Sequence, residues 1–453
     1  MEIKIYISLI VFCIGLLSGL PVFWAFLGSI FLILSLTGFS LTFVASSFYH
    51  SLNSPVFMAI TFFLLAGAVM AKSGVAEKIL AFSSLFVGKV KGGMISVGIM
   101  ASYIFGALTG SSIPCVAALI PLLVDPLEKI YGYEKRYTAA VLCVSAPLGY
   151  LIPPSVPVLI YCLLAKQSVA AVFLSTIIPG TLLCLGYLML NYFISDNYRH
   201  DTKSDKKSEN EIGGDSIENL NSTLIKKKLK IVYEALPALG TPILIFVGIY
   251  GGICTPSEAG AVAVVYTVFI GLMVYRKLNR KNLLSITYES VVTVGMIYVL
   301  IAFGIVLGRV FARLGIPQIF AESILETFKS KFMILIMMDL VLFILGMFID
   351  ATPTMIILVP LMIPIMNTID VNLVHFGAIF VLTEAIAVIT PPFAITLFAS
   401  ARLSKVPYNE LIGPILHYLL IVAIPVLLLT TFIPALSCWL PTLFMGSKVV
   451  GSW

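Results

Sequence analysis

The stretch GYLIPPSVPVLIY, residues 149–161, sets three prolines in a long, uncharged, apolar run. Such a run predicts a membrane-crossing helix, yet each proline removes a backbone donor and clashes with the preceding turn. Non-helical backbone at membrane depth is tolerated only where it is buried in protein or lines a water-filled cavity. The stretch therefore predicts a broken transmembrane helix whose unpaired backbone groups face an internal site.

The composition of the whole chain supports this interpretation. Of its 453 residues, 60% are hydrophobic and 11% are charged, and apolar runs recur from end to end. Runs of about 18 or more apolar residues are typical of membrane-spanning helices. The predicted fold class is an all-α polytopic membrane protein. The net charge of +6 is attributed to lysine-rich cytoplasmic loops, so we expect the lipid bilayer, and no nucleic acid, as a partner.

The two halves of the chain resemble each other. ALIPLLVDP (118–126) matches ILVPLMIPI (357–365), and LIPPSVPVLIY (151–161) matches ITPPFAITLFA (389–399), at an offset of 238 to 240 residues. A polar, low-complexity segment (196–230) separates the halves and is predicted to be a linker. A repeat that carries the same helix breaks in both copies is typical of secondary transporters.

Loop charges predict that the two copies enter the membrane from opposite sides. The positive-inside rule assigns four basic loops to the cytoplasm. These loops lie at residues 72–91, 129–136, 226–230 and 276–281. Segment 93–128 begins and ends on that side, so we predict a re-entrant hairpin with its turn near TGSS (109–112). Counting crossings places a second hairpin (332–367) on the outer side, with its turn near DATP (350–353) and an outer loop before it (309–331).

The predicted organisation therefore has six segments. They are N-terminal scaffold helices (1–92); a first transport repeat (93–195) with hairpin 93–128 and broken helix 137–165; a polar cytoplasmic linker (196–230); a second scaffold segment (231–331); a second transport repeat (332–403) with hairpin 332–367 and broken helix 372–403; and a C-terminal helix and tail (404–453).

The turns and breaks supply the oxygen atoms that a small cation requires. A broken helix frees carbonyl groups, and its half-helix ends carry partial charges to the midplane of the membrane. The predicted Na+ ligands are Gly110, Ser111, Ser112, Ile152, Ser155, Asp350, Thr352 and Thr390. The substrate is expected between the two hairpin tips, and its predicted contacts are Ser112, Ser155, Asp350, Pro391 and Arg402.

Several of these residues have a second interpretation. Asp350 at membrane depth requires a partner, so it is either an ion or substrate ligand or a helix cap, and it can be both. The serines are equally common as caps. The Arg402 guanidinium suits a carboxylate, although a snorkelling arginine is the ordinary alternative. Glu384 is a candidate coupling residue that gates protons, or half of a structural ion pair.

Five motifs resemble the large membrane subunit of the tripartite ATP-independent periplasmic (TRAP) transporters. They are GALTGSS (106–112), IPPSVPVLIY (152–161), GIYGGICTPSEAGAVAVVY (248–266), GMFIDATPTMIILVPLMIP (346–364) and TPPFAITLFASARL (390–403). The resemblance spans nearly the whole chain. It implies an elevator-type secondary transporter of a bacterial inner membrane, with Na+ as the coupling ion. It also implies import of an organic acid, a periplasmic substrate-binding protein, and a small membrane subunit that is here a separate chain.

The sequence departs from the family pattern at three places. Pro114 and Cys115 follow GSS where the family has a small residue and then an acid, and no acid occurs between Gly92 and Val124. Glu384 stands where an amide or a small residue is usual, and the linker is longer than usual.

The residues alone are compatible with other functions. A one-component carrier coupled to Na+ or H+ is the main alternative. An intramembrane enzyme is disfavoured because the sequence has no HExxH motif and no phosphate loop. A channel and a passive assembly subunit explain the duplicated breaks less well. No organic cofactor is expected.

Overall fold

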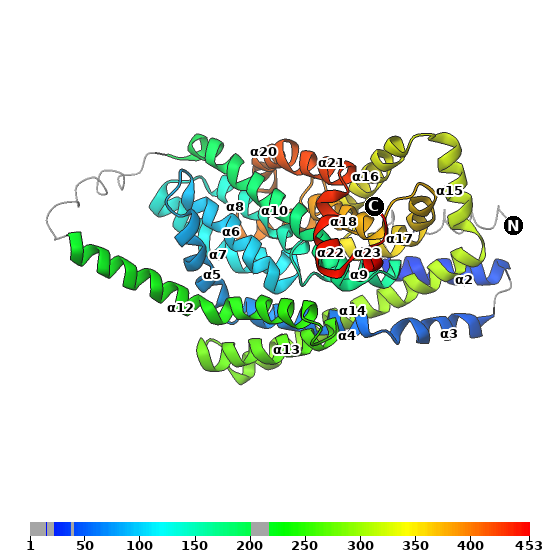
Figure 1. Ribbon diagram of the computed structural model, residues 1–453, viewed down its shortest axis with the longest axis horizontal. Helices are drawn as coiled ribbons and strands as arrows, with labels where there is room; N and C mark the ends of the chain where they lie inside the picture. Colours follow the sequence, from blue (N-terminus) through cyan, green and yellow to red (C-terminus); the bar gives the residue numbers. More distant parts are fainter. Residues whose placement is uncertain (1–14, 16–21, 38–39, 201–216) are drawn as a thin grey trace.

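The computed structural model describes residues 15, 22–37, 40–200 and 217–453 (Figure 1). Expectations for residues 1–14, 16–21 and 38–39, and for residues 201–216 of the polar linker, lie outside these described residues. Within them the secondary structure is helical, apart from an isolated bridge between Tyr133 and Arg199. In the described part of the chain, seven helices are long and apolar enough to cross a membrane, and an eighth span results if one bent pair is counted.

The N-terminal part contains four helices. They are α2 (Val22–Thr37), α3 (Leu41–Leu52), α4 (Pro55–Ala71) and α5 (Val75–Val87). Helices α3 and α4 form the bent pair, at 53°, because Ser54 and Pro55 start a new helix there. Helix α5 lies within residues 72–91, so the expectation of a plain loop is wrong. Its buried face, which includes Val75 and Ile79, packs on the protein and stabilises the helix.

The first repeat begins with a helical hairpin of α6 (Gly93–Thr109) and α7 (Ser112–Tyr131). Gly110 makes the turn with a φ of +60°, a conformation that suits glycine. Then follow α8 (Lys135–Ser145), the short η1 (Ala146–Tyr150), α9 (Val156–Ala165), α10 (Val169–Ile194) and η2 (Ser195–Tyr198). Residues 151–155 are not helical, and the Pro153–Pro154 peptide is cis.

The middle segment consists of α12 (Ile217–Tyr250), α13 (Pro256–Phe269), η3 (Ile270–Val274), α14 (Arg280–Arg313) and α15 (Ile316–Thr327). Thr255 and Glu258 form a capping box at the start of α13, which explains the TPSEA motif as a helix start. Two expectations need correction. Helix α12 begins inside the segment predicted as linker (196–230), and the predicted outer loop (309–331) contains α15, whose buried residues include Ile316 and Ile324.

The second repeat follows the same order. Its hairpin is α16 (Lys331–Phe348) and α17 (Ala351–Thr368), and its broken helix is α18 (Leu373–Ala387) and α19 (Ile395–Ser404). The Pro391–Pro392 peptide in the break is cis. Both broken helices end on a lysine in the left-handed conformation, Lys166 in the first repeat and Lys405 in the second.

The C-terminal segment contains more than the single helix that was predicted. It is made of α20 (Tyr408–Tyr418), η4 (Leu419–Ala423), α21 (Ile424–Phe432), α22 (Ala435–Met445) and α23 (Ser447–Val450). The chain turns at Pro434, and α22 then packs on α10.

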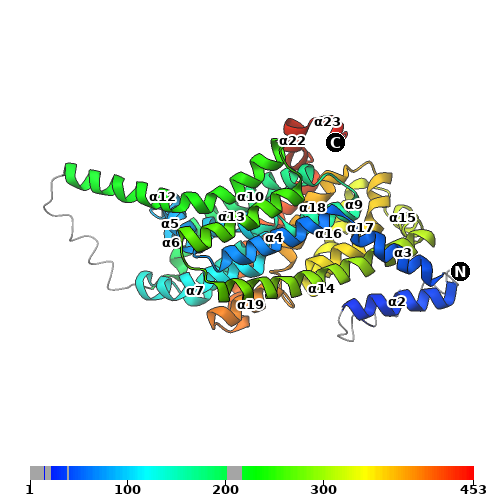
Figure 2. The same cartoon turned by 90° about the horizontal axis from the view of Figure 1, so that it is seen from below.

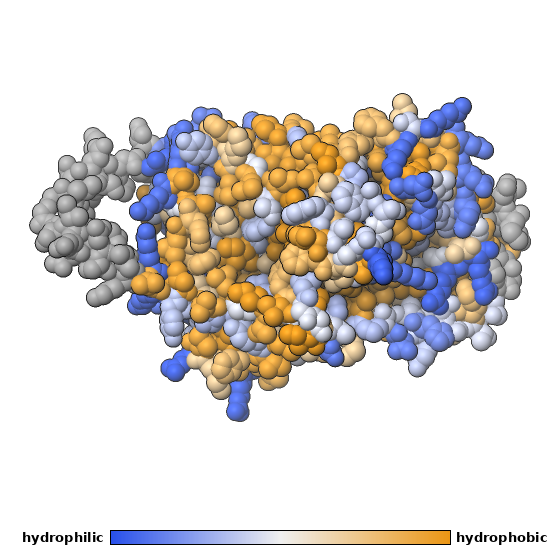
Figure 3. All heavy atoms as spheres, in the orientation of Figure 1, coloured by the Kyte–Doolittle hydropathy of each residue, from blue (hydrophilic) through white to orange (hydrophobic). Residues whose placement is uncertain are grey.

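The long helices lie on one side of the two repeats. Figures 1 and 2 show α3, α4, α12, α13 and α14 along one edge, with the hairpins and broken helices behind them. In Figure 3 hydrophobic residues cover the middle of the molecule, and hydrophilic residues gather at both ends of its long axis. This pattern is that of a protein that crosses a bilayer along the long axis.

Candidate transport site

The tip of the first hairpin rests against the break of the first repeat. The Val156 amide donates to the Gly110 carbonyl at 3.5 Å, across the two elements. A Cβ added at Gly110 would lie 2.5 Å from the Pro154 carbonyl oxygen, so no larger residue fits there without movement. The structure therefore joins the predicted turn and the predicted break into one unit.

Ser112 connects this unit to the second repeat. Its hydroxyl lies 3.1 Å from the Tyr150 hydroxyl and 3.0 Å from the Thr396 hydroxyl. Tyr150 ends η1, just before the first break, whereas Thr396 lies in the first turn of α19, just after the second break. Both Ser112 and Thr396 are almost fully buried. The first hairpin tip is thus held by residues next to both breaks.

Two carboxyl groups lie close to this cluster. Asp350 is the N-cap of α17 at the tip of the second hairpin, and its side chain is half-buried. Glu384 lies near the end of α18 and is fully buried. The two carboxyl groups are near enough to act on each other electrostatically, and both act on Tyr150. The site therefore combines hydroxyls from both repeats with acids from the second repeat alone.

The donor set consists of oxygen atoms. Within the described residues no group of three His, Cys, Asp or Glu side chains could hold a metal ion, so a site of the zinc type is not indicated. Ser111 and Asp350 are the N-caps at equivalent places in the two hairpins, and neither side chain makes a capping hydrogen bond. The Asp350 carboxyl lies near the Ala351 amide. Such oxygens, with carbonyls of interrupted helices, suit a hard monovalent cation like Na+.

The other predicted site residues have varied environments. The Ser155 hydroxyl accepts a hydrogen bond from the Val158 amide at 3.4 Å, so it caps α9. The Thr390 hydroxyl donates to the Ile386 carbonyl at 2.7 Å. Further, Ile152 is buried in the first break, and Thr352 and Pro391 are half-buried in and beside the second hairpin and break.

Arg402 does not join the cluster. It lies in the last turn of α19, six residues after Thr396, which corresponds to about 9 Å along a helix axis, and its side chain is exposed. Two cluster residues were missed in the sequence. Tyr150 lies within the quoted stretch, three residues before Pro153, but only the prolines and their immediate neighbours were considered as ligands. Thr396 corresponds to Val158 in the first repeat, which has no hydroxyl, so comparison of the repeats did not indicate it.

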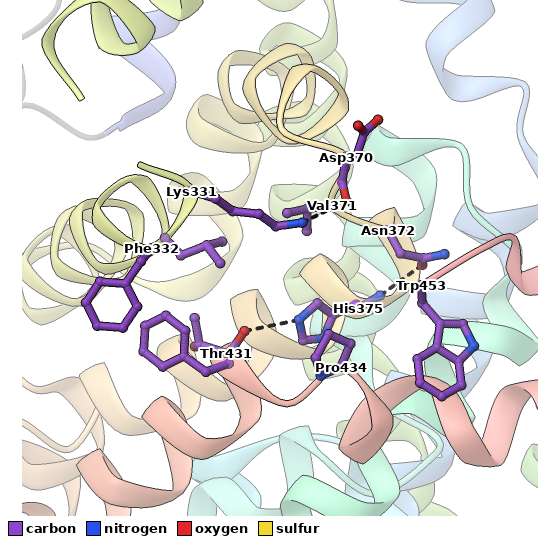
Figure 4. A pocket seen from close by; sticks show the side chains of 11 residues that line it. Lys331, Phe332, Asp370, Val371, Asn372, His375, Thr431, Pro434 and Trp453 are labelled. Carbon is purple, nitrogen blue, oxygen red and sulfur yellow. Dashed lines mark hydrogen bonds between the residues drawn. The ribbon is translucent and has the colours of Figure 1, made fainter. Parts of the chain in front are cut away.

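A separate cavity of about 320 Å³ opens where α16 and α18 begin and α21 ends (Figure 4). Lys331 donates to the Asp370 carbonyl at 3.0 Å on its rim. His375 is buried, with ring nitrogens 2.6 Å from the Ser437 hydroxyl and 3.3 Å from the Thr431 carbonyl. None of the predicted site residues lines this cavity.

The fold and the site define a class of protein. A polytopic helical chain, with two repeats whose hairpin tips and helix breaks meet, is a membrane transporter of the inverted-repeat kind. The crystal structure of the Alcanivorax borkumensis YdaH transporter has the same fold, with a TM-score of 0.59 and 14% identity over 86% of each chain. The predicted fold class is confirmed.

Comparison with known sequences gives the family. Residues 9–436 match the model of the "Tripartite ATP-independent periplasmic transporter, DctM component". The chain is 30% identical to the sialic acid TRAP transporter large permease protein SiaM of Vibrio cholerae, covering 96% of this chain and 97% of that protein. It is 31% identical to the C4-dicarboxylate TRAP transporter large permease protein DctM of Pseudomonas aeruginosa, over 85% and 86%. The chain belongs to the TRAP transporter large permease family, and is therefore a transporter subunit rather than an enzyme.

Proposed function

We propose that this chain is the transport subunit of a TRAP system that imports an organic acid into a bacterial cell through the inner membrane. The driving force is a Na+ gradient, and a periplasmic substrate-binding protein delivers the substrate. Membership of the family supports this proposal. The relatives named above are transporters of sialic acid and of C4-dicarboxylates, and both ligands are anions of organic acids.

The observation that carries the proposal is the meeting of helix N-termini around Ser112. Helix α7 starts at Ser112, whose hydroxyl bonds Tyr150, and α17 starts at Ala351, next to the Asp350 carboxyl that acts electrostatically on the same tyrosine. Helix α9 also starts here, but its Val156 and Val158 amides are already paired. The N-terminus of a helix carries a partial positive charge and unpaired amides, which favour a carboxylate. The substrate anion is thus bound by backbone amides and hydroxyls, and the exposed Arg402 is not required.

The same place supplies ligands of the opposite kind. The carbonyls of residues 151–155, the Ser111 hydroxyl and the Asp350 carboxylate are acceptors, so they bind the cation that accompanies the anion. A cation and an anion bound side by side neutralise each other, which lowers the cost of moving both through the membrane. This arrangement links uptake of the substrate to Na+.

The exposed apolar side chains of the long helices are where the small membrane subunit binds. Examples are Val247 on α12, Val265 on α13 and Val291 on α14, which are all more than half exposed. These helices lie together on one side of the repeats (Figure 2), so they form a continuous face.

Transport by the reconstituted system tests the proposal. The binding protein is first screened against organic acids by thermal shift, and the acid that stabilises it is used in radiolabelled form. Proteoliposomes that contain both membrane subunits should accumulate this acid only with the loaded binding protein outside and an inward Na+ gradient. Uptake of free acid by the large subunit alone would show a one-component carrier. Equal uptake with K+ in place of Na+ would disprove sodium coupling.

A further inference from the structure

Glu384 is a buried carboxyl without a hydrogen-bond partner. Its exposed fraction is 0%, and neither carboxyl oxygen has a partner among the described residues. It lies on the face of α18 that packs against α16 of the second hairpin, where a Cβ added at Gly346 would come within 3.2 Å of Oε2. The absence of a side chain at Gly346 leaves room for the carboxyl beside the hairpin tip.

The charges around Glu384 do not compensate an ionised carboxylate. The titratable groups that act on it electrostatically are Asp350, at the start of α17, and Tyr150, at the end of η1. The other acid on the packed helices, Asp339 of α16, accepts a hydrogen bond from Thr431 at 2.8 Å. His375, at the other end of α18, contacts Ser437 and Thr431. Helices α9, α10 and α22 also pack on α18, and the titratable side chains within these three helices are tyrosines and cysteines.

An ionised carboxylate in these surroundings is strongly unfavourable. Burial of an unpaired charge costs far more than burial of the neutral acid, and a second carboxylate nearby adds repulsion. The group therefore holds a proton whenever no cation is near. A cation bound at the tip of the second hairpin reverses this balance, because its field stabilises the charged form.

The repeat shows that the acid is not needed for the fold. At the offset of 238 residues that aligns the two double prolines, Glu384 corresponds to Ala146. The close contact beside it is conserved between the repeats, because Gly106 packs on Gly149 as Gly346 packs on Ala387. The first repeat thus builds the same helix contact with a methyl group where the second has a carboxyl.

We propose that Glu384 exchanges its proton for the cation, so that Na+ binding at the second hairpin is linked to proton release. This inference rests on the proposed Na+ coupling. When Na+ enters, the O–H bond of Glu384 breaks and the proton passes to water, while the resulting carboxylate is balanced by the Na+ charge. The net charge of the site is then unchanged by ion binding, and the transporter runs Na+ inward against H+ in each cycle.

Proton release on Na+ binding tests the exchange without any substrate. The purified full chain, in weakly buffered detergent solution with a pH indicator, is titrated with NaCl and, as a control, KCl. Na+ binding is followed in parallel by thermal stabilisation. Wild-type protein should release up to about one proton per bound Na+, and its apparent Na+ affinity should fall up to about tenfold per pH unit on acidification.

Variants test whether the released proton comes from Glu384 or from another group of the protein. Glu384→Gln should bind Na+ without proton release and without the pH slope, and Glu384→Ala, which copies the first repeat, should do the same. Asp339→Asn, at the other buried acid, should behave as wild type. Na+ binding without proton release in the wild type, or undiminished release in both Glu384 variants, would overturn the exchange alone. Absence of Na+ binding in the wild type would instead contradict the proposed sodium coupling, and the exchange with it.

Discussion

Gly106→Ala changes the closest backbone contact beside the site. The added Cβ would lie 2.3 Å from the Gly149 Cα and 2.7 Å from the Gly149 nitrogen. Ordinary contacts between carbon atoms are about 3.5 to 4.0 Å long, so α6 and η1 must separate by more than about 1 Å. Overpacking of this kind costs about 1–3 kcal/mol, and the upper end applies because the opposing atoms are backbone and cannot rotate away.

The displacement acts directly on the proposed ligands. Gly106 lies one turn before the hairpin tip that carries Ser112, and Gly149 precedes Tyr150. Binding sites require their groups to be placed within about 0.5 Å, so a shift of about 1 Å separates the Ser112 and Tyr150 hydroxyls. If the whole of this cost, about 3 kcal/mol at its upper end, falls on the bound state, Na+ affinity decreases by about 150-fold.

Thermal unfolding at increasing Na+ concentration measures this effect. Gly106→Ala should fold, unfold at a lower temperature, and need more Na+ for half of the stabilisation. Gly295→Ala is the matched control, because nothing lies within 4 Å of the Cβ added there on α14. That variant should equal the wild type or gain up to about 1 kcal/mol of helix stability. A Gly106→Ala protein that titrates with Na+ as the wild type does would refute the argument that this contact positions the site.

Three further predictions use the same preparation. Ser112→Ala removes the hydroxyl that bonds Tyr150 and Thr396, so Na+ affinity should fall by an amount equivalent to about 1–3 kcal/mol. The control is Ser83→Ala, which removes a buried hydroxyl without a partner in the described structure and should have no effect. Asp350→Asn keeps the shape and removes the charge, so a large loss of Na+ affinity is expected, and a small loss would mean that Asp350 only caps α17. In a background without native cysteines, Lys129→Cys should react only from the cytoplasm and Lys329→Cys only from the periplasm; labelling of both from one side would disprove the opposite insertion of the hairpins.

The sequence predicts the interrupted helices well because their causes are local. Prolines at 153, 154, 391 and 392 stop a helix whatever surrounds them, and Gly110 permits the left-handed turn wherever it stands. The apolar runs and the repeat then give the order of hairpins and breaks. Helices α5 and α15 were not predicted because charged residues flank their short apolar faces. In the sequence such segments resemble loops until the surface that they pack on is known.

The contacts of the site could not be predicted to the same degree because they join distant parts of the chain. Ser112 and Thr396 are separated by 284 residues, and no local pattern relates them. Ser155 has the residue type of a ligand, but the geometry of the α9 start gives its hydroxyl a capping role. Arg402 has the charge that a substrate anion favours, but the length of α19 carries it away from the cluster. Residue type identifies candidates, and packing selects among them.

The difference between the repeats bears on how the transporter closes. Both hairpin tips present an uncapped N-cap side chain, but Ser111 is neutral whereas Asp350 is acidic and has Glu384 nearby. The first tip is held by contacts between uncharged hydroxyls, since Ser112 bonds protein groups of both repeats. Under the proposed coupling, the second tip packs closely only when Asp350 and the neighbouring Glu384 of α18 are neutralised, by protons or by Na+, because unpaired carboxylates repel each other and retain water. Under the proposed Na+ coupling, the charge on the second repeat makes its hairpin the one whose position is expected to depend more strongly on the ion.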